Sequence, residues 1–519
     1  MAFKDVLKEK ILDLIERNFK VRVDFVPVSY PDVKDFGDYA TTIALSSAKL
    51  IKRNPKEIAE VLARELDDRA VFSKIEVAGP GYINFFVSDN VLENSILDAI
   101  KIEDYGKNNY LGDKNILLEY VSANPTGPLH IGHGRWAAIG DSLANLLLYC
   151  GAKVYREFYI NDTGNQVKLL RQSVEAVRRG IPIPENGYHG SYIKEIAKMD
   201  GDPVENLLSI QKKTLECFRV SFDNYFSEKT LHDSNRVIET LEFLKNSGHC
   251  YEKDGALWFK TTEFGDDKDR VLIKNDGEFT YFAVDIAYHK NKIERGFNTL
   301  INILGADHHG YVNRLEAAIK IFAKELKRAL EIKIIIGQLV SLFRNGEPVR
   351  MSKRTGEMIT LEEVIDEIGA DATRYFLVMR KADTPLDFDI EIAKKQSEEN
   401  PVYYVQYAHA RISGILRNLE KKLDVDVKGC IENEEARDVA LRILRFPEVC
   451  LDSAISLEPH RITQYLEDLA STFHRYYNHY RIITDDEATT KKRLAIVMAT
   501  KKVLNLGLRL IGVSAPDKM

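Results

Sequence analysis

Along residues 1–105, apolar positions follow a helical period in some segments and a strand period in others. Residues 1–20 repeat apolar side chains three and four positions apart, which predicts an amphipathic helix. The run VRVDFV then predicts a strand, KEIAEVLARELDD a second helix, and IEVAGPGYINFFVS two strands around a Gly-Pro-Gly turn. Together these segments predict a small α+β domain over residues 1–105.

A different pattern begins after residue 105. NILLEYVSAN predicts a buried strand, which a loop rich in Pro and Gly joins to a helix over residues 131–150. KVYREFYIND, FTYFAVDIAY, LINILGA and KIIIGQLVSLF predict further strands, with another helix at 314–327. Such alternation predicts a parallel, doubly wound sheet over residues 106–385. The polar stretch at about 180–270 interrupts the alternation and is interpreted as an insertion.

Strand patterns cease near residue 386. Helical periodicity covers residues 390–422, 433–457, 459–483 and 488–512, and Pro401, Pro447 and Pro459 mark expected starts or bends. Residues 386–519 are therefore expected to form a separate, all-α helix bundle.

Composition narrows the class of protein. The chain has 519 residues, 45% of them hydrophobic, and a formal net charge of -6, which argues against binding nucleic acid by bulk charge alone. A local basic surface could still bind RNA. The five cysteines are irregularly spaced, so we expect neither a zinc site nor a disulfide framework. Without a long apolar run or a secretory leader, we expect a cytoplasmic protein with no membrane contact.

The loop and helix start in EYVSANPTGPLHIGHGR hold the first candidate chemistry. His130 and His133 lie three residues apart, on one face at a helix N-terminus. Backbone N–H groups and the helix dipole attract anions there, and Gly132 lets a phosphate approach the backbone. Taken alone, two histidines at this spacing also fit a surface or core pair.

A second candidate is the basic segment EPVRMSKRTGE. Arg350, Lys353 and Arg354 place three cations within five residues, beside Gly356. A compact ammonium such as that of Lys353 suits a transferring or leaving phosphate. The alternative is a solvated basic loop.

These two motifs, in this order around alternating strands and helices, resemble the class I aminoacyl-tRNA synthetases. The HIGH tetrapeptide of that class stands unchanged at residues 130–133. Its KMSKS loop appears as Arg350, Met351, Ser352, Lys353 and Arg354, with arginine in place of the first lysine and of the last serine. The role of Arg350 therefore stays open. The resemblance implies a Rossmann-like catalytic domain.

Wider stretches are similar to the arginyl-tRNA synthetases in particular. They include YINDTGNQ, LGADHHGYVNR, MSKRTGE, YVQYAHARI and the N-terminal GPGYINFFV, so the resemblance spans the whole chain. It implies that the substrates are L-arginine, Mg-ATP and tRNA(Arg), bound by a catalytic domain, an N-terminal tRNA-binding module and a helical anticodon-binding domain. It also implies that arginine is activated only while tRNA is bound. We expect a monomer that binds no DNA and holds no zinc.

The resemblance also implies residue roles on the ATP side. His130, His133 and Lys353 would be catalytic. The ATP-binding positions would be His130, Gly132, His133, Gln338, Arg350, Met351, Ser352 and Lys353.

A guanidinium is best held by paired carboxylates, which points to Glu119 and Asp285. Glu119 ends the first strand, and Asp285 is expected on or just after the strand FTYFAVD, so both could face one pocket at the carboxyl edge of the sheet. The alternative is that Glu119 caps a loop and Asp285 pairs with a structural lysine. The resemblance adds Tyr281, Asn124 and Asp307 to the arginine-binding set, although Asp307 could instead serve a turn.

In PVYYVQYAHAR, aromatic rings lie beside cations, as unstacked anticodon bases require. Tyr407 and Arg411 are four residues apart and share a helix face, so we assign tRNA binding to this pair. For Tyr403 and Tyr404 a place in the core is favoured.

Two other functions compete with the synthetase interpretation. A small-molecule nucleotidyltransferase could share the helix with His130 and His133, but it would not need the helix bundle or an N-terminal tRNA-binding module. A non-catalytic tRNA-binding relative would be expected to lose His133 or Lys353, and both are present.

Overall fold

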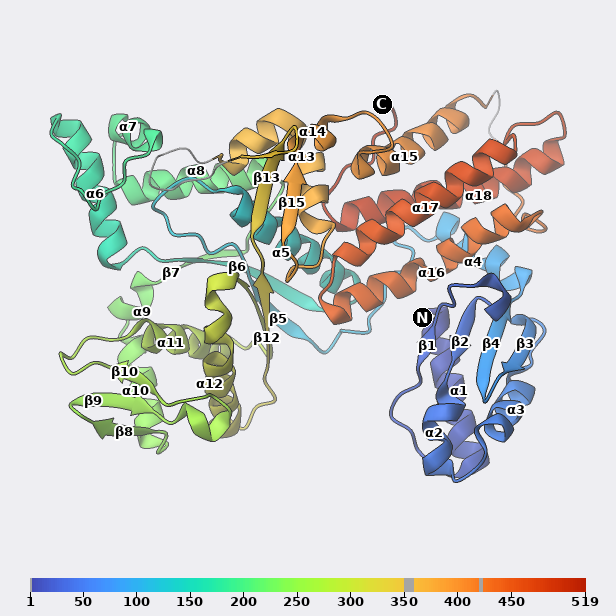
Figure 1. Ribbon diagram of the computed structural model, residues 1–519, viewed down its shortest axis with the longest axis horizontal. Helices are drawn as coiled ribbons and strands as arrows, with labels where there is room; N and C mark the ends of the chain where they lie inside the picture. Colours follow the sequence, from blue (N-terminus) through green and yellow to red (C-terminus); the bar gives the residue numbers. More distant parts are fainter. Residues whose placement is uncertain (1, 350–358, 420–422) are drawn as a thin grey trace.

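The computed structural model describes residues 2–349, 359–419 and 423–519, with the side chains of residues 307–309 left aside. Figure 1 shows the N-terminal elements at one side of the molecule, close to the helices of the C-terminal half. The small sheet β8–β10 lies at the opposite side, and the parallel sheet lies between the two.

The N-terminal part forms an antiparallel sheet with helices. Its elements are α1 (Phe3–Phe19), β1 (Val28–Ser29), η1 (Lys34–Phe36), β2 (Tyr39–Thr41), α2 (Ile43–Ile51), α3 (Pro55–Leu66), β3 (Phe72–Ala78), β4 (Tyr82–Val87) and α4 (Asp89–Lys101). The strand order is β1-β2-β4-β3. The strand predicted at VRVDFV is wrong. Pairing with the three-residue β2 starts only at Val28, and Phe25 is 69% exposed.

Buried polar contacts hold this domain against α16 (Glu434–Ser456). Glu448 is 2% exposed and accepts hydrogen bonds from the Tyr30 hydroxyl at 2.5 Å, the Tyr39 hydroxyl at 3.0 Å and the Lys4 backbone N–H at 2.8 Å. Arg437 donates to both oxygens of Asp38. These contacts place the N-terminal domain beside the helical domain.

The middle of the chain forms the predicted doubly wound sheet. Its strands are β5 (Asn115–Glu119), β6 (Lys153–Ile160), β7 (Asn224–Ser227), β11 (Thr299–Gly305) and β12 (Glu331–Gly337), all parallel, in the order β12-β11-β5-β6-β7. The chain winds in opposite directions from β5, so the switch point where ligands bind in such sheets lies between β5 and β11.

Helices and two small sheets surround these strands. The helices are α5 (Ile131–Tyr149), α6 (Gly164–Arg179), α7 (Ser191–Lys198), α8 (Pro203–Cys217), α9 (Lys229–Asp233), α10 (Arg236–Asn246), α11 (Tyr281–Glu294), α12 (Val312–Glu325) and α13 (Leu361–Val378), with η2 (Thr261–Phe264) and η3 (Ala306–Tyr311). The small sheets are β8 (Cys250–Lys253), β9 (Ala256–Phe259) and β10 (Arg270–Ile273), and β13 (Val340–Arg344), β14 (Glu347–Pro348) and β15 (Leu386–Asp389).

Several predicted elements differ from the structure. FTYFAVDIAY is not a strand but the start of α11, with Thr280 as its N-cap. KIIIGQLVSLF forms two strands, β12 and β13, instead of one. Because β7 pairs with β6, the stretch at 180–270 is not a single insertion outside the sheet. Strands also continue beyond residue 385, since β15 pairs with β13.

The C-terminal part is helical, as predicted. It contains α14 (Ile390–Lys394), α15 (Pro401–Arg417), α16, α17 (His460–His479) and α18 (Glu487–Leu510). The predicted helix at 390–422 is two helices, because Pro401 starts α15 after a turn in which Asn400 donates to the carbonyls of Ala393 and Lys395. Pro447 lies inside α16.

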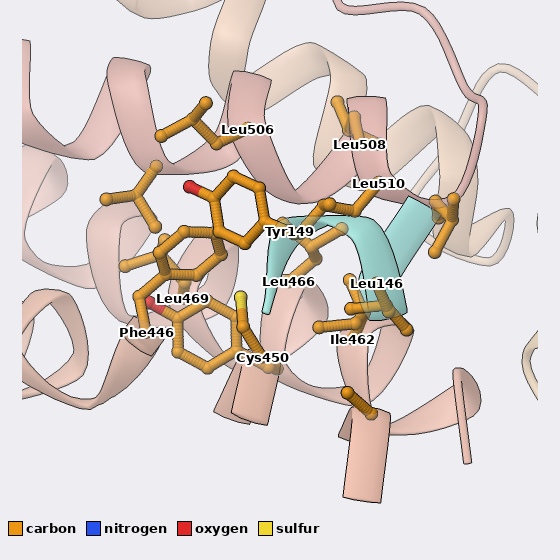
Figure 2. Packing of buried hydrophobic residues seen from close by; sticks show 14 of the residues in the cluster. Leu146, Tyr149, Phe446, Cys450, Ile462, Leu466, Leu469, Leu506, Leu508 and Leu510 are labelled. Atoms are coloured by element: carbon orange, nitrogen blue, oxygen red, sulfur yellow. The ribbon is translucent and has the colours of Figure 1, made fainter. Parts of the chain in front are cut away.

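Helix α5 joins the sheet to this helical domain. Fifteen of its 19 residues are buried, on all sides of the helix. Figure 2 shows Leu146 and Tyr149 near its end packed among Phe446 and Cys450 of α16, Leu466 of α17 and Leu506 of α18. The start of the same helix faces the switch point of the sheet.

The close approach of β5 to α5 depends on Gly140. A Cβ there would lie 2.3 Å from two ring atoms of the buried Tyr120. We expect Gly140→Ala to lower the free energy of unfolding by about 1–3 kcal/mol through overpacking. Chemical denaturation measures the change. The matched control is Gly414→Ala, where a helix has room for a Cβ, and it should be neutral or stabilising by about 1 kcal/mol.

Candidate active site

The start of α5 is held by its two histidines. His130 is the N-cap, and its Nδ1 accepts a hydrogen bond from the Gly132 N–H at 3.1 Å. His133 returns the contact, because its Nδ1 accepts from the His130 N–H at 3.2 Å, and the two rings stack with centroids 3.7 Å apart. Both Nδ1 atoms act as acceptors, so in the neutral rings the proton lies on Nε2. The pair therefore carries its Nε2–H groups at a helix N-terminus.

The segment from 347 to 360 ends beside this pair. His130 forms an antiparallel bridge with Thr360, and the Leu361 N–H donates to the Leu129 carbonyl at 2.8 Å. At its other end, the Val349 N–H donates to the Leu342 carbonyl at 2.8 Å. Arg350, Met351, Ser352 and Lys353 lie outside the described residues. The structure thus describes the residues on either side of the basic segment, Val349 and Thr360, and Thr360 lies at His130.

Strained backbone follows β5. Val121 and Ser122 have φ values of 68° and 41°. A β-branched residue at positive φ is costly, and such strain concentrates at functional sites. The turn is held by the Ser122 hydroxyl, which donates to Glu119 Oε1 at 3.0 Å and accepts from the Tyr159 N–H at 3.1 Å. The strain directs the chain from Glu119 toward the start of α5.

Glu119 lies at the switch point and is 6% exposed. Its Oε2 accepts from Lys292 Nζ at 2.5 Å and from Asn302 Nδ2 at 3.3 Å, where Lys292 comes from α11 and Asn302 from β11. Lys292 has no exposed side-chain surface. The alternative interpretation had paired Asp285 with a structural lysine. The structure has such a lysine, Lys292, but it pairs with Glu119.

Asp285 lies on α11, not on or after a strand as predicted from FTYFAVD. The helix carries it near Glu119, and the Tyr311 hydroxyl donates to its carboxyl group. Removal from water raises the pKa of Asp285 to about 7. The charges of Glu119 and Glu228 add to the rise, while the Tyr311 hydrogen bond and Lys292 oppose it. Burial and Lys292 hold the pKa of the neighbouring His289 well below its usual range, so that ring is neutral.

Two further predicted arginine-binding residues, Asn124 and Tyr281, lie close in sequence to Glu119 and Asp285. Asn124 is exposed in the loop after β5, and its Nδ2 donates to Gln166 Oε1 at 2.9 Å. Tyr281 opens α11, one helical turn before Asp285, and is 82% exposed. Asp307 belongs to η3, directly after β11, and its side chain lies outside the described part. The structure thus brings Glu119 and Asp285 together but leaves the Tyr281 ring in solvent.

Gln338 directly follows β12. Its N–H donates to the Ala382 carbonyl at 2.8 Å, and its own carbonyl accepts from Arg135 Nη1 at 2.9 Å. Arg135 is fully buried in α5. The Gln338 backbone is therefore fixed to the helix that carries His130 and His133.

Tyr407 and Arg411 form part of an aromatic surface on α15. The Tyr407 ring is 37% exposed and stacks on Tyr403 and on His474 of α17, with centroids 6.0 and 5.9 Å away. The Arg411 guanidinium lies 4.3 Å from the centre of the Tyr477 ring and 5.6 Å from that of Tyr407. Tyr404 packs against the core, as favoured from the sequence.

Sequence reasoning missed Lys292, Asn302 and Tyr311. Lys292 lies among charged residues that follow the apolar start of α11, and this made it look like a surface residue. Asn302 is a polar side chain inside the apolar strand LINILGA, and that mismatch was a usable signal.

No metal-binding group was expected in the protein itself. Among the described residues, no group of three or more His, Cys, Asp or Glu side chains is arranged to hold a metal ion. The same residues include no helix long and apolar enough to cross a membrane.

Comparison with known families agrees with this geometry. A family model described as tRNA synthetases class I (R), catalytic domain, matches residues 96–181 and 192–394. The parallel sheet, the histidine pair at the start of α5 and this match define a class I aminoacyl-tRNA synthetase, an enzyme class that uses ATP.

Models described as the arginyl tRNA synthetase N terminal domain and the DALR anticodon binding domain match residues 2–87 and 405–519. Proteins named arginine–tRNA ligase from Bacillus licheniformis and Bacillus subtilis are each 44% identical, with 99% of both chains covered. The chain belongs to the arginyl-tRNA synthetase family. The fold agrees with Thermus thermophilus arginyl-tRNA synthetase, which has a TM-score of 0.83 and 23% identity, with both chains covered completely. These matches decide against the two alternative functions, a small-molecule nucleotidyltransferase and a non-catalytic tRNA-binding relative.

The Glu119–Lys292 pair gives a test of the pocket's charge balance. Lys292→Met leaves a buried carboxylate without its cation, and we expect a loss of about 3–5 kcal/mol in the free energy of unfolding. Glu119→Gln in the same chain should recover much of that loss. Denaturant titration of wild type, both single variants and the double variant measures the coupling. Equal destabilisation of Lys292→Met and the double variant would show that the lysine acts through packing alone.

Proposed function

We propose that arginine adenylation takes place between the start of α5 and the carboxyl ends of β5 and β11. The arginine carboxylate attacks the α-phosphorus of ATP, which enters as its magnesium complex, and the bond to pyrophosphate breaks. The 2′-hydroxyl of the terminal ribose of tRNA(Arg) then attacks the arginyl carbonyl, and AMP leaves. The observation that carries this proposal is the interlocked pair His130 and His133, bridged to Thr360 at the end of the basic segment.

On the ATP side, His130 and His133 donate from Nε2 to the phosphates, and the donation strengthens as charge develops in the transition state. Gly132 lets the phosphates approach the helix N-terminus. The backbone around Gln338 lies against adenine. Lys353, with Arg350, Met351 and Ser352, covers the pyrophosphate. The anchors at Val349 and Thr360 support this last assignment.

On the arginine side, Glu119 and Asp285 hold the guanidinium. Lys292 offsets the negative charge of Glu119, and the guanidinium of arginine offsets that of Asp285. Asn124 and Asp307 lie toward the amino and carboxylate groups of the substrate. Tyr281, one turn before Asp285 on α11, covers the guanidinium when arginine is bound.

On the tRNA side, the Tyr407 ring and the Arg411 guanidinium receive an unstacked anticodon base and its phosphate. The last residues of the chain support α15 from a neighbouring face. His409 Nδ1 contacts the Pro516 carbonyl at 2.9 Å, and Ser413 donates to Asp517 at 2.7 Å. The N-terminal domain, docked on α16, serves as a second tRNA contact.

We further infer that the enzyme acts as a cytoplasmic monomer with no affinity for DNA. Sedimentation velocity at micromolar concentration tests the oligomeric state.

The phosphate assignment predicts that His133→Ala and Lys353→Ala each slow adenylation about 10- to 1000-fold, or about 1.4–4 kcal/mol of barrier. The measurement is ATP–pyrophosphate exchange with arginine in the presence of tRNA. The arginine KM should change little, because both groups lie on the phosphate side. A well-folded Lys353→Ala protein that exchanges at the wild-type rate would refute the role of Lys353.

The arginine pocket predicts a dependence on pH. Asp285 is charged above its pKa of about 7 and loses its negative charge as pH falls below it, so arginine binding should weaken by up to about tenfold per pH unit below pH 7. Asp285→Asn should raise the arginine KM steeply, by about 2–5 kcal/mol of binding, and flatten the pH profile while ATP affinity stays nearly constant. Wild-type arginine kinetics in this variant would make Asp285 purely structural.

The aromatic surface predicts that Tyr407→Ala weakens tRNA binding by about 1–3 kcal/mol, the contribution of one stacked base. Equilibrium binding of tRNA(Arg) measures it. Tyr403→Ala is a matched control, since that less exposed ring stacks on Tyr407 and should change affinity less. If Tyr407→Ala binds tRNA normally, the ring belongs to the core of the helical domain.

A further inference from the structure

A cavity of about 480 Å³ lies where the parallel sheet meets the end of the helical domain. Its walls come from Asn145 on α5, Arg156 on β6, Arg219 in the turn before β7, Arg509 on α18 and the chain at 512–515. Asn145 is twelve residues along α5 from His133, which corresponds to about 18 Å of helix. The cavity is therefore separate from the phosphate site.

Arginine side chains dominate the charged groups that line this cavity. It contains three arginine guanidiniums and one carboxylate, that of Asp141. Asp141 Oδ2 already accepts from Nη2 of the fully buried Arg374 at 2.6 Å. Arg156 is 4.0 Å from the other Asp141 oxygen. Arg219 and Arg509 pair with carboxylates outside the lining, those of Asp371 and Asp104. Together with Arg374, the ion pairs around the cavity thus join four guanidiniums to three carboxylates.

The three guanidiniums keep donors for a ligand. Arg156 Nη2 donates to Asn145 Oδ1 at 2.7 Å, Arg219 Nη2 donates to Asp371, and Arg509 Nη2 donates to Asp104 Oδ1 at 2.5 Å. A guanidinium has five N–H donors, so each of these bonds occupies a small part of the group. The side chains of Arg219 and Arg509 are 41% and 55% exposed, which makes their remaining donors accessible from solvent.

We propose that this cavity binds a small oligophosphate, such as an inorganic or nucleoside polyphosphate. Forked guanidinium donors match phosphate oxygens, and three of them from separate segments favour a ligand with two or more charged groups. A bound oligophosphate would connect β6 and the turn at Arg219 with α18. It would thereby fasten the C-terminal segment, whose Ser514 N–H donates to Asp371 of α13 at 3.0 Å, to the catalytic domain.

Calorimetric titration of the full chain with inorganic tripolyphosphate tests the proposal. The titration uses a His133→Ala background, in which the phosphate site is weakened. We expect binding to persist there and to weaken about tenfold or more when Arg509→Gln or Arg156→Gln is added, since each substitution removes a charge-assisted donor. The matched control is Arg442→Gln on α16, whose guanidinium pairs with Asp468 outside the cavity and should leave the affinity unchanged.

Two further measurements separate the free ligand from RNA phosphate and from a folding defect. In the otherwise wild-type enzyme, Arg509→Gln should bind tRNA(Arg) and catalyse pyrophosphate exchange normally, because the cavity serves a free oligophosphate. Its far-ultraviolet circular dichroism and melting curve should match those of Arg442→Gln. Equal tripolyphosphate affinity with and without Arg509→Gln and Arg156→Gln overturns the proposal. It also fails if His133→Ala alone abolishes binding, or if the arginine variants lose affinity for tRNA but not for tripolyphosphate.

Discussion

Burial of α5 on all sides is the constraint on which the rest of the structure depends. One end of this helix carries His130 and His133, and the other end packs among α16, α17 and α18. A helix enclosed in this way cannot rotate or slide without opening the core. The histidine pair, the sheet and the helical domain therefore keep fixed positions relative to one another. Gly140 permits the approach of β5 to the helix.

The cluster around Glu119 and Asp285 shows a second constraint, the cost of buried charge. Glu119 is compensated by Lys292, and Asn302 joins Glu119 to the neutral ring of His289, whose Nε2 lies 3.0 Å from the Asn302 amide. Asp285 accepts from the Tyr311 hydroxyl, and its pKa is raised although Lys292 lowers it. Among the described residues, two carboxylates and one lysine thus meet here, an arrangement that favours a cationic ligand.

Much of the fold was predictable because its signals are local. The pattern around β5, α5, β6 and α12 places strands and helices within a few residues of their observed bounds. The apolar run at 279–288 misled because a short apolar segment fits a buried strand and a buried helix equally well. Burial of α11 on most of its faces removed the periodicity that would have separated the two, and Thr280, a typical N-cap, was the remaining local signal.

The sequence by itself determined the two signature motifs, the order of strands and helices and the candidate carboxylates, because each depends on residue type and spacing along the chain. Only the tertiary structure decided that Lys292 faces Glu119, that Asp285 reaches the pocket from a helix, and that Arg156, Arg219 and Arg509 meet around one cavity. These groups lie far apart in sequence. Which of them end up within a few ångströms depends on how α5, α11 and α18 pack, and no local pattern encodes that packing.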